Sequence, residues 1–321
     1  MKPHLTLPAL LACCLCLHAS PSRGASGDVK LTEQKDGKVL VEVGGKPFTV
    51  YHFNDAEGRP FVRPYFYPVR AADGTVVTDD QVLTTGDHPH HRSLWVSHGD
   101  VNGADHWSFA QNPPPKQRHV RFARLEGDTI VQELEWESRT RGEALLKETR
   151  TVRFFTFDDG SRGIDLSVAL TPAGSRRVTL GDTKEAGICA VRMKKDISDN
   201  PTLTNAAGKT GEEQTWGKPA EWCDISGRIA GKPYGVAVLD HPKNPRHPST
   251  WHVRKYGLLA ANVFGLHDFD KKNPPRTGDF PIEPGKTVTF RYRVVIHGGD
   301  AKSANLDQKF KDYAAAVARA D

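Results

Sequence analysis

Histidines are concentrated in one short stretch of the chain. Residues 87–107, DHPHHRSLWVSHGDVNGADHW, contain five of the 14 histidines, together with two tryptophans. An imidazole can bind a transition metal, move a proton near neutral pH, or hydrogen-bond to polar groups. The stretch therefore indicates a metal site, a proton-transfer site or a polar ligand surface.

A metal site needs more ligands than this stretch offers at suitable spacing. His88 and His90 would face the same side of a strand, and two imidazoles with a carboxylate are a common transition-metal set. Arg92 follows where an acidic ligand is needed, and the His-Glu-x-x-His zinc pattern is absent from the chain. The pattern disfavours a metal, and a divalent ion at His88 and His90 stays the weaker alternative.

Proton transfer needs a second titratable group and a cation that positions the substrate. Glu148, Glu185 and Arg63 are candidates, although their spacing does not tie them to the histidines. The structural alternative is that histidines in Gly- and Pro-rich loops bond to backbone carbonyls. Trp95 and Trp107 in the same stretch favour a ligand surface, because solvated loops seldom carry two tryptophans.

A second stretch has the same composition. Residues 240–252, DHPKNPRHPSTWH, again combine Asp-His-Pro with further histidines and a tryptophan. Both stretches adjoin apolar runs, which places them at strand ends. A groove of Trp, His, Asn, Asp and Arg suits a carbohydrate, whose apolar face covers an aromatic ring. We expect the two loops to meet around His90, His91, Trp95, His241 and Trp251; the alternative is two unrelated Pro-rich loops.

The elements that must position these loops are strands. Short alternating runs separated by Gly-Gly, Gly-Asp and Asp-Gly turns predict hairpins at 39–53, 125–136 and 145–170, and 287–294 alternates in the same way. Only the C-terminus predicts a helix, with Ser303 as its cap and an apolar face formed by Leu306, Phe310, Tyr313 and Val317. No linker divides the chain, so we predict one all-β domain over residues 28–321, a large and mostly antiparallel sandwich.

The N-terminus predicts export. Lys2 precedes a short apolar run at residues 5–17, and small and polar residues follow, which is the layout of a signal peptide over residues 1–25. Residues 10–13 also resemble a lipoprotein box, with Cys13 as the lipidated residue. No later segment has the apolar length that a membrane helix needs. The protein is expected to be periplasmic or extracellular.

Cysteines and charge set two further expectations. Only Cys189 and Cys223 remain after the signal, and in an oxidising compartment they could form a disulfide or stay two separate buried thiols. The net charge is +5, with basic and acidic residues interleaved. Without a basic stripe or a known motif, nucleic-acid binding is not expected.

Several motifs stand out along the chain: residues 63–65, 87–92, 98–103, 105–107, 222–227, 240–244 and 251–254, with Trp95, Glu185, Arg192 and Tyr292-Arg293. Together they resemble the DUF6807 family of mostly exported bacterial proteins, often labelled "methane oxygenase", a label that nothing in this sequence supports. The resemblance runs from about residue 29 to 300. It implies a galactose-mutarotase-like supersandwich with a sugar-facing groove, in which a His works with a carboxylate and an Arg holds the sugar.

The sequence thus predicts an exported carbohydrate-active protein that works at or near the anomeric carbon as an epimerase, hydrolase or lyase. His90 or His91 would be the acid and Glu185 the base, while Arg63 and Arg92 position the sugar and Trp95, Trp107 and Trp251 act as platforms. The alternatives are a non-catalytic sugar-binding protein and a metal-dependent oxygenase or lyase. Further ligand-binding residues are expected at Tyr65, His88, His98, His106, Arg192, His241, Asn244 and His252.

Overall fold

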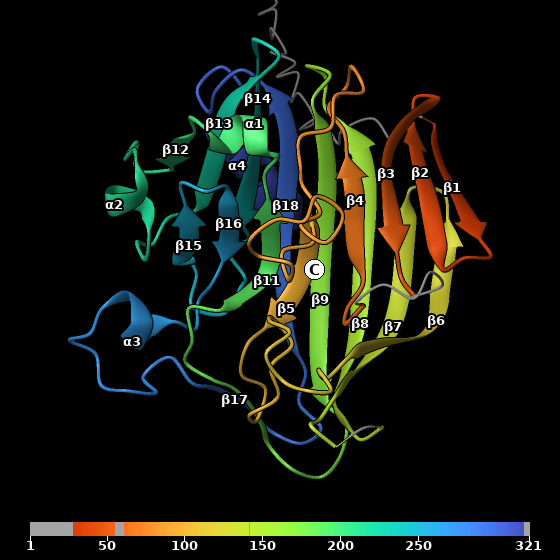
Figure 1. Cartoon of the computed structure of the whole chain (residues 1–321), viewed down its shortest axis with the longest axis vertical. Coiled ribbons are helices and arrows are strands. Elements are labelled where there is room, and N and C mark those ends of the chain that lie inside the picture. Colours follow the sequence, from red (N-terminus) through yellow and green to blue (C-terminus); the bar gives the residue numbers. More distant parts are fainter. Residues whose placement is uncertain (1–27, 55–60, 141, 318–321) are drawn as a thin grey trace, which may run out of the picture.

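Two large antiparallel sheets form the protein (Figure 1). The structure is a computed structural model that describes residues 28–54, 61–140 and 142–317. The predicted signal peptide over residues 1–25 and the lipidation site at Cys13 lie outside these ranges. Among the helices within them, none has the length and apolar character that a bilayer crossing requires.

Each large sheet has eight strands, named here the first and the second sheet. The first sheet runs, in spatial order, β1 (Val29–Gln34), β2 (Lys38–Val43), β3 (Lys46–His52), β4 (Tyr65–Val69), β5 (Leu94–His98), β11 (Ala186–Arg192), β16 (Leu258–Ala261) and β15 (Trp251–Arg254). The second runs β12 (Thr202–Asn205), β13 (Trp222–Ile229), β14 (Lys232–Asp240), β18 (Val288–Gly298), β9 (Arg162–Pro172), β8 (Ala144–Thr156), β7 (Thr129–Glu137) and β6 (Gln117–Glu126).

The remaining elements are short. A third sheet has two strands, and three of the helices are single turns. These elements are β10 (Val178–Leu180), β17 (Phe280–Ile282), α1 (Lys195–Ser198), α2 (Glu212–Thr215), α3 (Leu266–Phe269) and α4 (Leu306–Val317). The predicted antiparallel β-sandwich with a short C-terminal helix is confirmed.

The hairpins form where the alternating pattern predicts them. β2 and β3 are joined by Gly44 and Gly45, whose φ angles of 59° and 70° suit a tight hairpin turn. Along β7 every second residue is buried, so one face packs into the sandwich and the other is more accessible. The main core lies between the two sheets and includes residues from both ends of the chain, such as Val39 and Val294.

The C-terminal helix covers the outer face of the second sheet. Leu306 and Tyr313 of α4 pack against Trp222 and Leu239 of that sheet. The helix begins three residues beyond Ser303, so the predicted cap is wrong. The Ser303 hydroxyl instead accepts a hydrogen bond from the Asp300 amide at 2.9 Å, within a turn that precedes the helix.

Candidate functional site

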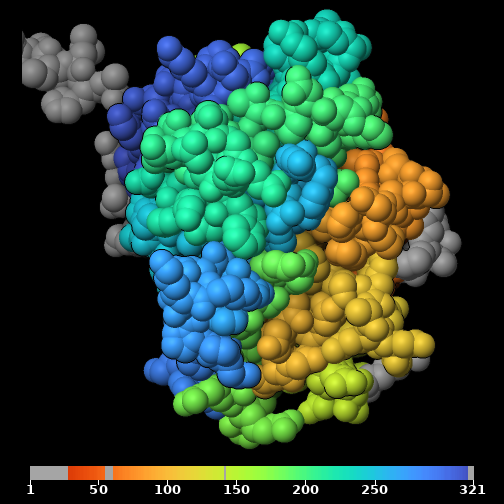
Figure 2. All heavy atoms as spheres, turned by 60° about the vertical axis from the view of Figure 1, so that its left-hand side comes forward, coloured from red at the N-terminus to blue at the C-terminus, as the bar shows by residue number. Residues whose placement is uncertain are grey.

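The outer face of the first sheet carries an aromatic cluster of its own. In β5, Leu94 and Val96 point into the main core, so Trp95 between them points outward. Tyr65 of β4 and Leu258 of β16 join Trp95 there. In Figure 2 the orange and yellow segments of residues 70–116, the green start of β11 and the blue segment of residues 250–275 adjoin on one face.

Four aromatic rings stack above this cluster. The ring of Tyr256, in the turn between β15 and β16, stacks on His88 at 4.9 Å between centroids. His88 stacks on His91 at 4.8 Å, and His91 on Trp95 at 5.4 Å. The outer rings of the stack, Tyr256 and His88, are partly exposed, whereas His91 and Trp95 are buried. The stack therefore runs from the surface down to the sheet.

Buried arginines hold the loops that supply these rings. Arg63 donates to the backbone carbonyls of His90 and His106, which ties the loop before β5 to the loop after it. Arg92 pairs with Asp80, with Nε 2.6 Å from Oδ1. Both arginines are at least 97% buried and directed at protein groups. Arg63 and Arg92 therefore position the loops in this structure, and their predicted role in positioning a sugar stays a prediction that this geometry disfavours.

His91 is a neutral hydrogen-bond acceptor. Its Nδ1 lies 3.1 Å from Nη1 of Arg192, and a guanidinium can only donate, so the His91 proton is on Nε2. Burial holds the pKa of His91 far below its ordinary value. Burial, with the charge of Arg63, lowers the pKa of His90 to about 4. Burial therefore favours the neutral form of both rings, which disfavours the acid role predicted for His90 and His91.

His88 has the surroundings of a proton-transfer group. Its Nδ1 lies 2.7 Å from Oδ1 of Asp87, and this hydrogen bond lowers the pKa of Asp87. The His88 side chain is 31% exposed and that of Asp87 is 73% exposed. A carboxylate on Nδ1 fixes the tautomer of the ring, and no described hydrogen bond engages Nε2.

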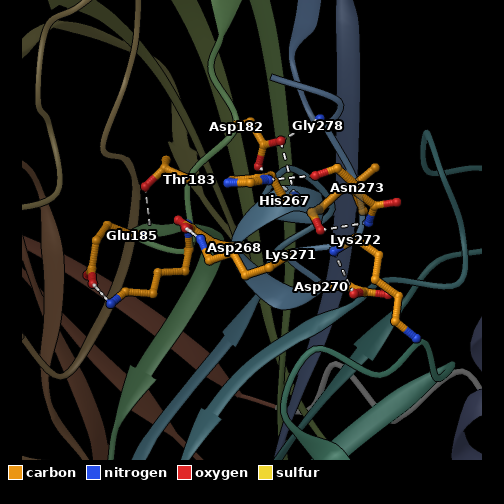
Figure 3. A network of polar contacts seen from close by, with 12 residues as sticks. Asp182, Thr183, Glu185, His267, Asp268, Asp270, Lys271, Lys272, Asn273 and Gly278 are labelled. Atoms are coloured by element: carbon orange, nitrogen blue, oxygen red, sulfur yellow. Dashed lines mark hydrogen bonds and ion pairs between the residues drawn. The ribbon is translucent and has the colours of Figure 1, made fainter. Parts of the chain in front are cut away.

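Glu185 lies immediately before β11, held by contacts of the segment that contains α3 (Figure 3). Asp182 accepts hydrogen bonds from the amides of His267 and Gly278, at 3.1 and 2.8 Å. Asp268 accepts one from the amide of Lys184 at 2.9 Å. These contacts hold the backbone of residues 182–184, which immediately precede Glu185, against the segment that contains α3.

The Glu185 carboxylate is 42% exposed and lies 3.5 Å from the Lys184 ammonium. Burial raises the pKa of Tyr256 to about 12, and the negative charge of Glu185 acts in the same direction. Glu185 thus shares one electrostatic environment with the exposed end of the ring stack. The other predicted carboxylate, Glu148, is buried between the sheets in an ion pair with Arg150, with Oε1 and Nε 2.6 Å apart.

Several predicted ligand-binding residues have structural roles instead. The Nε2 atoms of His98 and His106 bond to the carbonyls of Gly181 and Glu137, each at 3.0 Å, and both side chains are buried. His252 bonds through Nδ1 to the carbonyl of Lys184 at 2.7 Å. Trp95 and Trp107 are also buried, so in this structure they support the site from below and present no open platform.

The two His-Pro loops do not form one site. β14, before the second loop, belongs to the second sheet, and β15, after it, belongs to the first, so the loop crosses between the layers. His241 packs on Tyr313 of α4 at 5.0 Å, and Asn244 donates to Asp240 at 2.7 Å. Trp251 lies in the main core and donates to the carbonyl of Ala220. The expected meeting with His90, His91 and Trp95 is wrong.

The metal and disulfide alternatives have little geometric support in the described ranges. There, no three His, Cys, Asp or Glu side chains are grouped as metal ligands. The rings of His88 and His90 lie 5.7 Å apart and nearly perpendicular, and His88 Nδ1 is engaged by Asp87. Cys189 and Cys223 are two free buried thiols, each with a pKa raised by burial.

An open hollow of about 830 Å³ lies beside the Pro-rich loop, and none of the four stacked rings lines it. Two of its polar side chains are already engaged: Arg118 pairs with Glu135, and His119 bonds to Gln132 at 2.8 Å. The ring stack instead combines exposed aromatic surface with a partly exposed His–Asp pair. For this reason we take the stack, despite its shallower surface, as the candidate site.

Sequence reasoning missed Tyr256 and the partnership of Asp87 with His88. Asp87 stands in the Asp-His-Pro motif, so adjacency to His88 was a usable signal. Tyr256 lies in a short turn, Lys255-Tyr256-Gly257, that carries no motif, and only the pairing of β15 with β16 brings its ring over His88.

Comparison with known proteins found a family match and distant structural neighbours. No functionally curated protein matches the chain. A galactose mutarotase-related enzyme from Lactobacillus acidophilus is 10% identical, with a TM-score of 0.35 over 84% of this chain and 97% of that one. An aldose epimerase homologue from C. elegans is 9% identical, with a TM-score of 0.36 over 85% and 98%. The sequence model of DUF6807, a family of unknown function, matches residues 38–311, and the chain belongs to that family.

Proposed function

We propose that the protein binds a carbohydrate on the outer face of the first sheet and acts on it by proton transfer. The observation that carries this proposal is the Asp87–His88 pair at the exposed end of the ring stack, next to Tyr256 and Arg192. Partly exposed rings offer a surface for the apolar face of a sugar, and the adjacent polar groups can take its hydroxyls.

The reaction class follows from the available groups. His88 Nε2 accepts a proton from a sugar hydroxyl or from a carbon next to a carbonyl, and Asp87 stabilises the imidazolium that results. Glu185 is the second group that can exchange a proton on this face. Epimerisation, hydrolysis and eliminative cleavage at or near the anomeric carbon all require such a pair.

The test is a screen of the purified protein against a panel of mono- and oligosaccharides, with and without added divalent metal. Turnover that is lost in His88→Gln and kept in His247→Gln supports the proposal. His247 is a matched control, because its Nδ1 also lies 2.7 Å from an aspartate, Asp240, but on the other loop. Turnover that appears only with metal would favour the metal-dependent alternative.

Non-catalytic sugar binding is the second candidate. The neutral state of His90 and His91 and the ion pair of Glu185 with Lys184 favour it, because they leave His88 as the one histidine of the stack placed for proton transfer. Sugar binding to the wild-type protein without turnover in the same screen would select this candidate.

We also propose that the protein is exported. Support comes from the signal-peptide layout of residues 1–25. Mass analysis of the protein from cell fractions tests it: a chain that begins near residues 20–28, or at a lipidated Cys13, is expected. Full-length chain in the cytoplasmic fraction alone would contradict it.

A further inference from the structure

We infer that the ligand of the ring-stack site is an acidic sugar and that Arg192 binds its anionic group. This inference rests on the proposed carbohydrate function and narrows it to sugars that carry an oxyanion, either the carboxylate of a uronate or a phosphate. The reasons are the state of the Arg192 guanidinium and the charges that surround it.

Arg192 is buried without a carboxylate in hydrogen-bonding distance. Its side chain is 8% exposed, and the nearest carboxylate oxygen, Oδ1 of Asp87, is 3.7 Å away. That same oxygen accepts the hydrogen bond of His88, and most of the Asp87 side chain is in water. The buried Nε of Arg192 has no hydrogen-bond partner. Burial of a cation that has an unpaired N–H donor costs free energy of folding, unless a ligand accepts the missing hydrogen bond.

The other deeply buried arginines each make two contacts with carboxylates or carbonyls of the protein. Arg92, Arg150 and Arg293 each contact both oxygens of one carboxylate. Arg63 and Arg162 donate to two backbone carbonyls each, although Nε of Arg63, like that of Arg192, has no partner. Arg192 differs from all five, because its one hydrogen bond goes to the neutral His91 ring. Nη2 of Arg192 lies 3.7 Å from Oδ1 of Asp87 at the site, and the unpartnered Nε is buried next to it.

The ring of Tyr256 orients this guanidinium. The Arg192 carbon Cζ lies 4.9 Å from the centroid of Tyr256, and the same ring stacks on His88. A guanidinium that packs on a ring keeps its N–H groups along its edge, where a carboxylate or phosphate can accept two parallel hydrogen bonds. An oxyanion on Nε and Nη2 would therefore lie beside the His88–Asp87 pair.

The carboxylates around Arg192 do not give it a hydrogen-bonded counter-charge. Asp87, at 3.7 Å, and the more distant Asp79 are the carboxylates that act on its guanidinium. By contrast, Arg254, on the other side of Tyr256, is paired with Glu212 at 3.2 Å. A ligand oxyanion would therefore supply Arg192 with the direct contact that the protein does not provide.

Isothermal titration calorimetry of the mature protein tests the inference with glucuronate, galacturonate and glucose 6-phosphate against glucose and galactose. We expect at least one acidic sugar to bind about 10-fold or more tightly than its neutral counterpart. Arg192→Gln should weaken that ligand by about 10- to 100-fold, as expected for loss of a charge-assisted bidentate contact. Arg192→Lys keeps the positive charge but loses the two parallel N–H donors, so its affinity for that ligand should lie between those of the wild type and Arg192→Gln.

The control variant is Arg254→Gln, which also removes a charge near Tyr256 but leaves Arg192 in place; it should change acidic-sugar binding less than about threefold. Thermal melts verify that each variant is folded, and Arg192→Lys keeps the test valid if Arg192→Gln is not. Uronate binding without glucose 6-phosphate binding assigns the oxyanion to a carboxylate, and the reverse assigns it to a phosphate.

Equal binding of acidic and neutral sugars, or acidic-sugar binding unchanged in both Arg192 variants, would overturn the inference and leave the carbohydrate proposal standing. If no sugar binds, inorganic phosphate and acetate are titrated next. Binding of either that depends on Arg192 would support the anion site and remove the carbohydrate proposal. No binding of any probe would overturn both.

Discussion

The two Asp-His-Pro loops have the same composition and opposite surroundings. In each, a histidine Nδ1 lies 2.7 Å from an aspartate oxygen. Asp87 of the first loop is 73% exposed, whereas Asp240 of the second is fully buried. The first pair stands at the open end of a ring stack, and the ring of the second histidine, His247, packs 6.3 Å from Phe310 of α4.

The flanking strands explain the difference. The first loop leaves β4 and returns to β5 in the same sheet, so it folds back over the outer face of that sheet. The second loop joins β14 of the second sheet to β15 of the first, so its polar groups are used to hold a crossing between layers. Asp240 accepts hydrogen bonds from Asn244 and from the amide of Ser249 in addition to His247. The same motif is therefore exposed in one loop and structural in the other.

Replacement of His88 or His247 by glutamine should reveal the largest difference between the two loops. In His88→Gln we expect turnover to fall about 10²- to 10⁴-fold, because glutamine can hydrogen-bond but cannot carry a proton near neutral pH. In His247→Gln, turnover per folded molecule should stay within about twofold of wild type. Steady-state rates on the best substrate of the glycan screen provide the measurement. Equal losses in both variants would abolish the distinction between the loops.

Replacement of the two aspartates by asparagine should affect stability more in the second loop than in the first, the reverse of the order expected for turnover. Asp240→Asn should lower the free energy of unfolding by about 2–4 kcal/mol, since a buried carboxylate loses three charge-assisted contacts. Asp87→Asn should cost less than about 0.5 kcal/mol, because that carboxylate is mostly in water. Urea denaturation at pH 7 measures both. A larger loss for Asp87→Asn would mean that the exposed loop is the structural one.

In acid the two stretches should behave alike. Burial lowers the pKa of His106 to about 3 and that of His252 to about 4, from ordinary values near 6.5. The unfolded chain binds protons that the folded chain does not, so stability should fall as the pH drops from about 6.5 to about 4. His106→Gln and His252→Gln should each reduce that slope by up to about 1.4 kcal/mol per pH unit. Denaturation at pH 4.5, 5.5, 6.5 and 7.5 shows the slopes; unchanged slopes would mean that neither ring is buried in its neutral form.

Reduction should have the smallest effect. Cys189 belongs to the first sheet and Cys223 to the second, and both are free thiols in the core. A strong reductant should therefore leave the melting temperature unchanged within about 1 °C. A fall of several degrees would show that the disulfide alternative holds in the exported protein.

Much of the fold could be predicted from the sequence because its determinants are local. The Gly44-Gly45 turn and the alternation in β7 are set by neighbouring residues, and so is the apolar face of α4. The position of each loop depends on which sheet the next strand joins. That choice is set by strand pairing between residues far apart in the sequence. The motif around His241 and Trp251 therefore does not reveal that His241 packs on α4 or that Trp251, in the first sheet, faces the core.

The candidate site was predicted only in part for a related reason. Residue type pointed to the histidine stretch, but burial decides which histidine can exchange a proton. His90 and His91 differ from His88 by exposure and by partner, and neither property can be derived from a run of adjacent histidines. Arg63 and Arg92 likewise have the residue type of a sugar-binding group, but their guanidinium groups are directed at carbonyls and at Asp80.

The most direct measurement is a crystal structure of the protein with the tightest sugar from the glycan panel. We predict a sugar ring against Tyr256, a hydroxyl or ring atom within hydrogen-bonding distance of His88 Nε2, and any anionic group on Arg192. A sugar held instead beside α4 at His241 and His247, or in the hollow next to the Pro-rich loop, would contradict the assignment of the site to the first His-Pro loop.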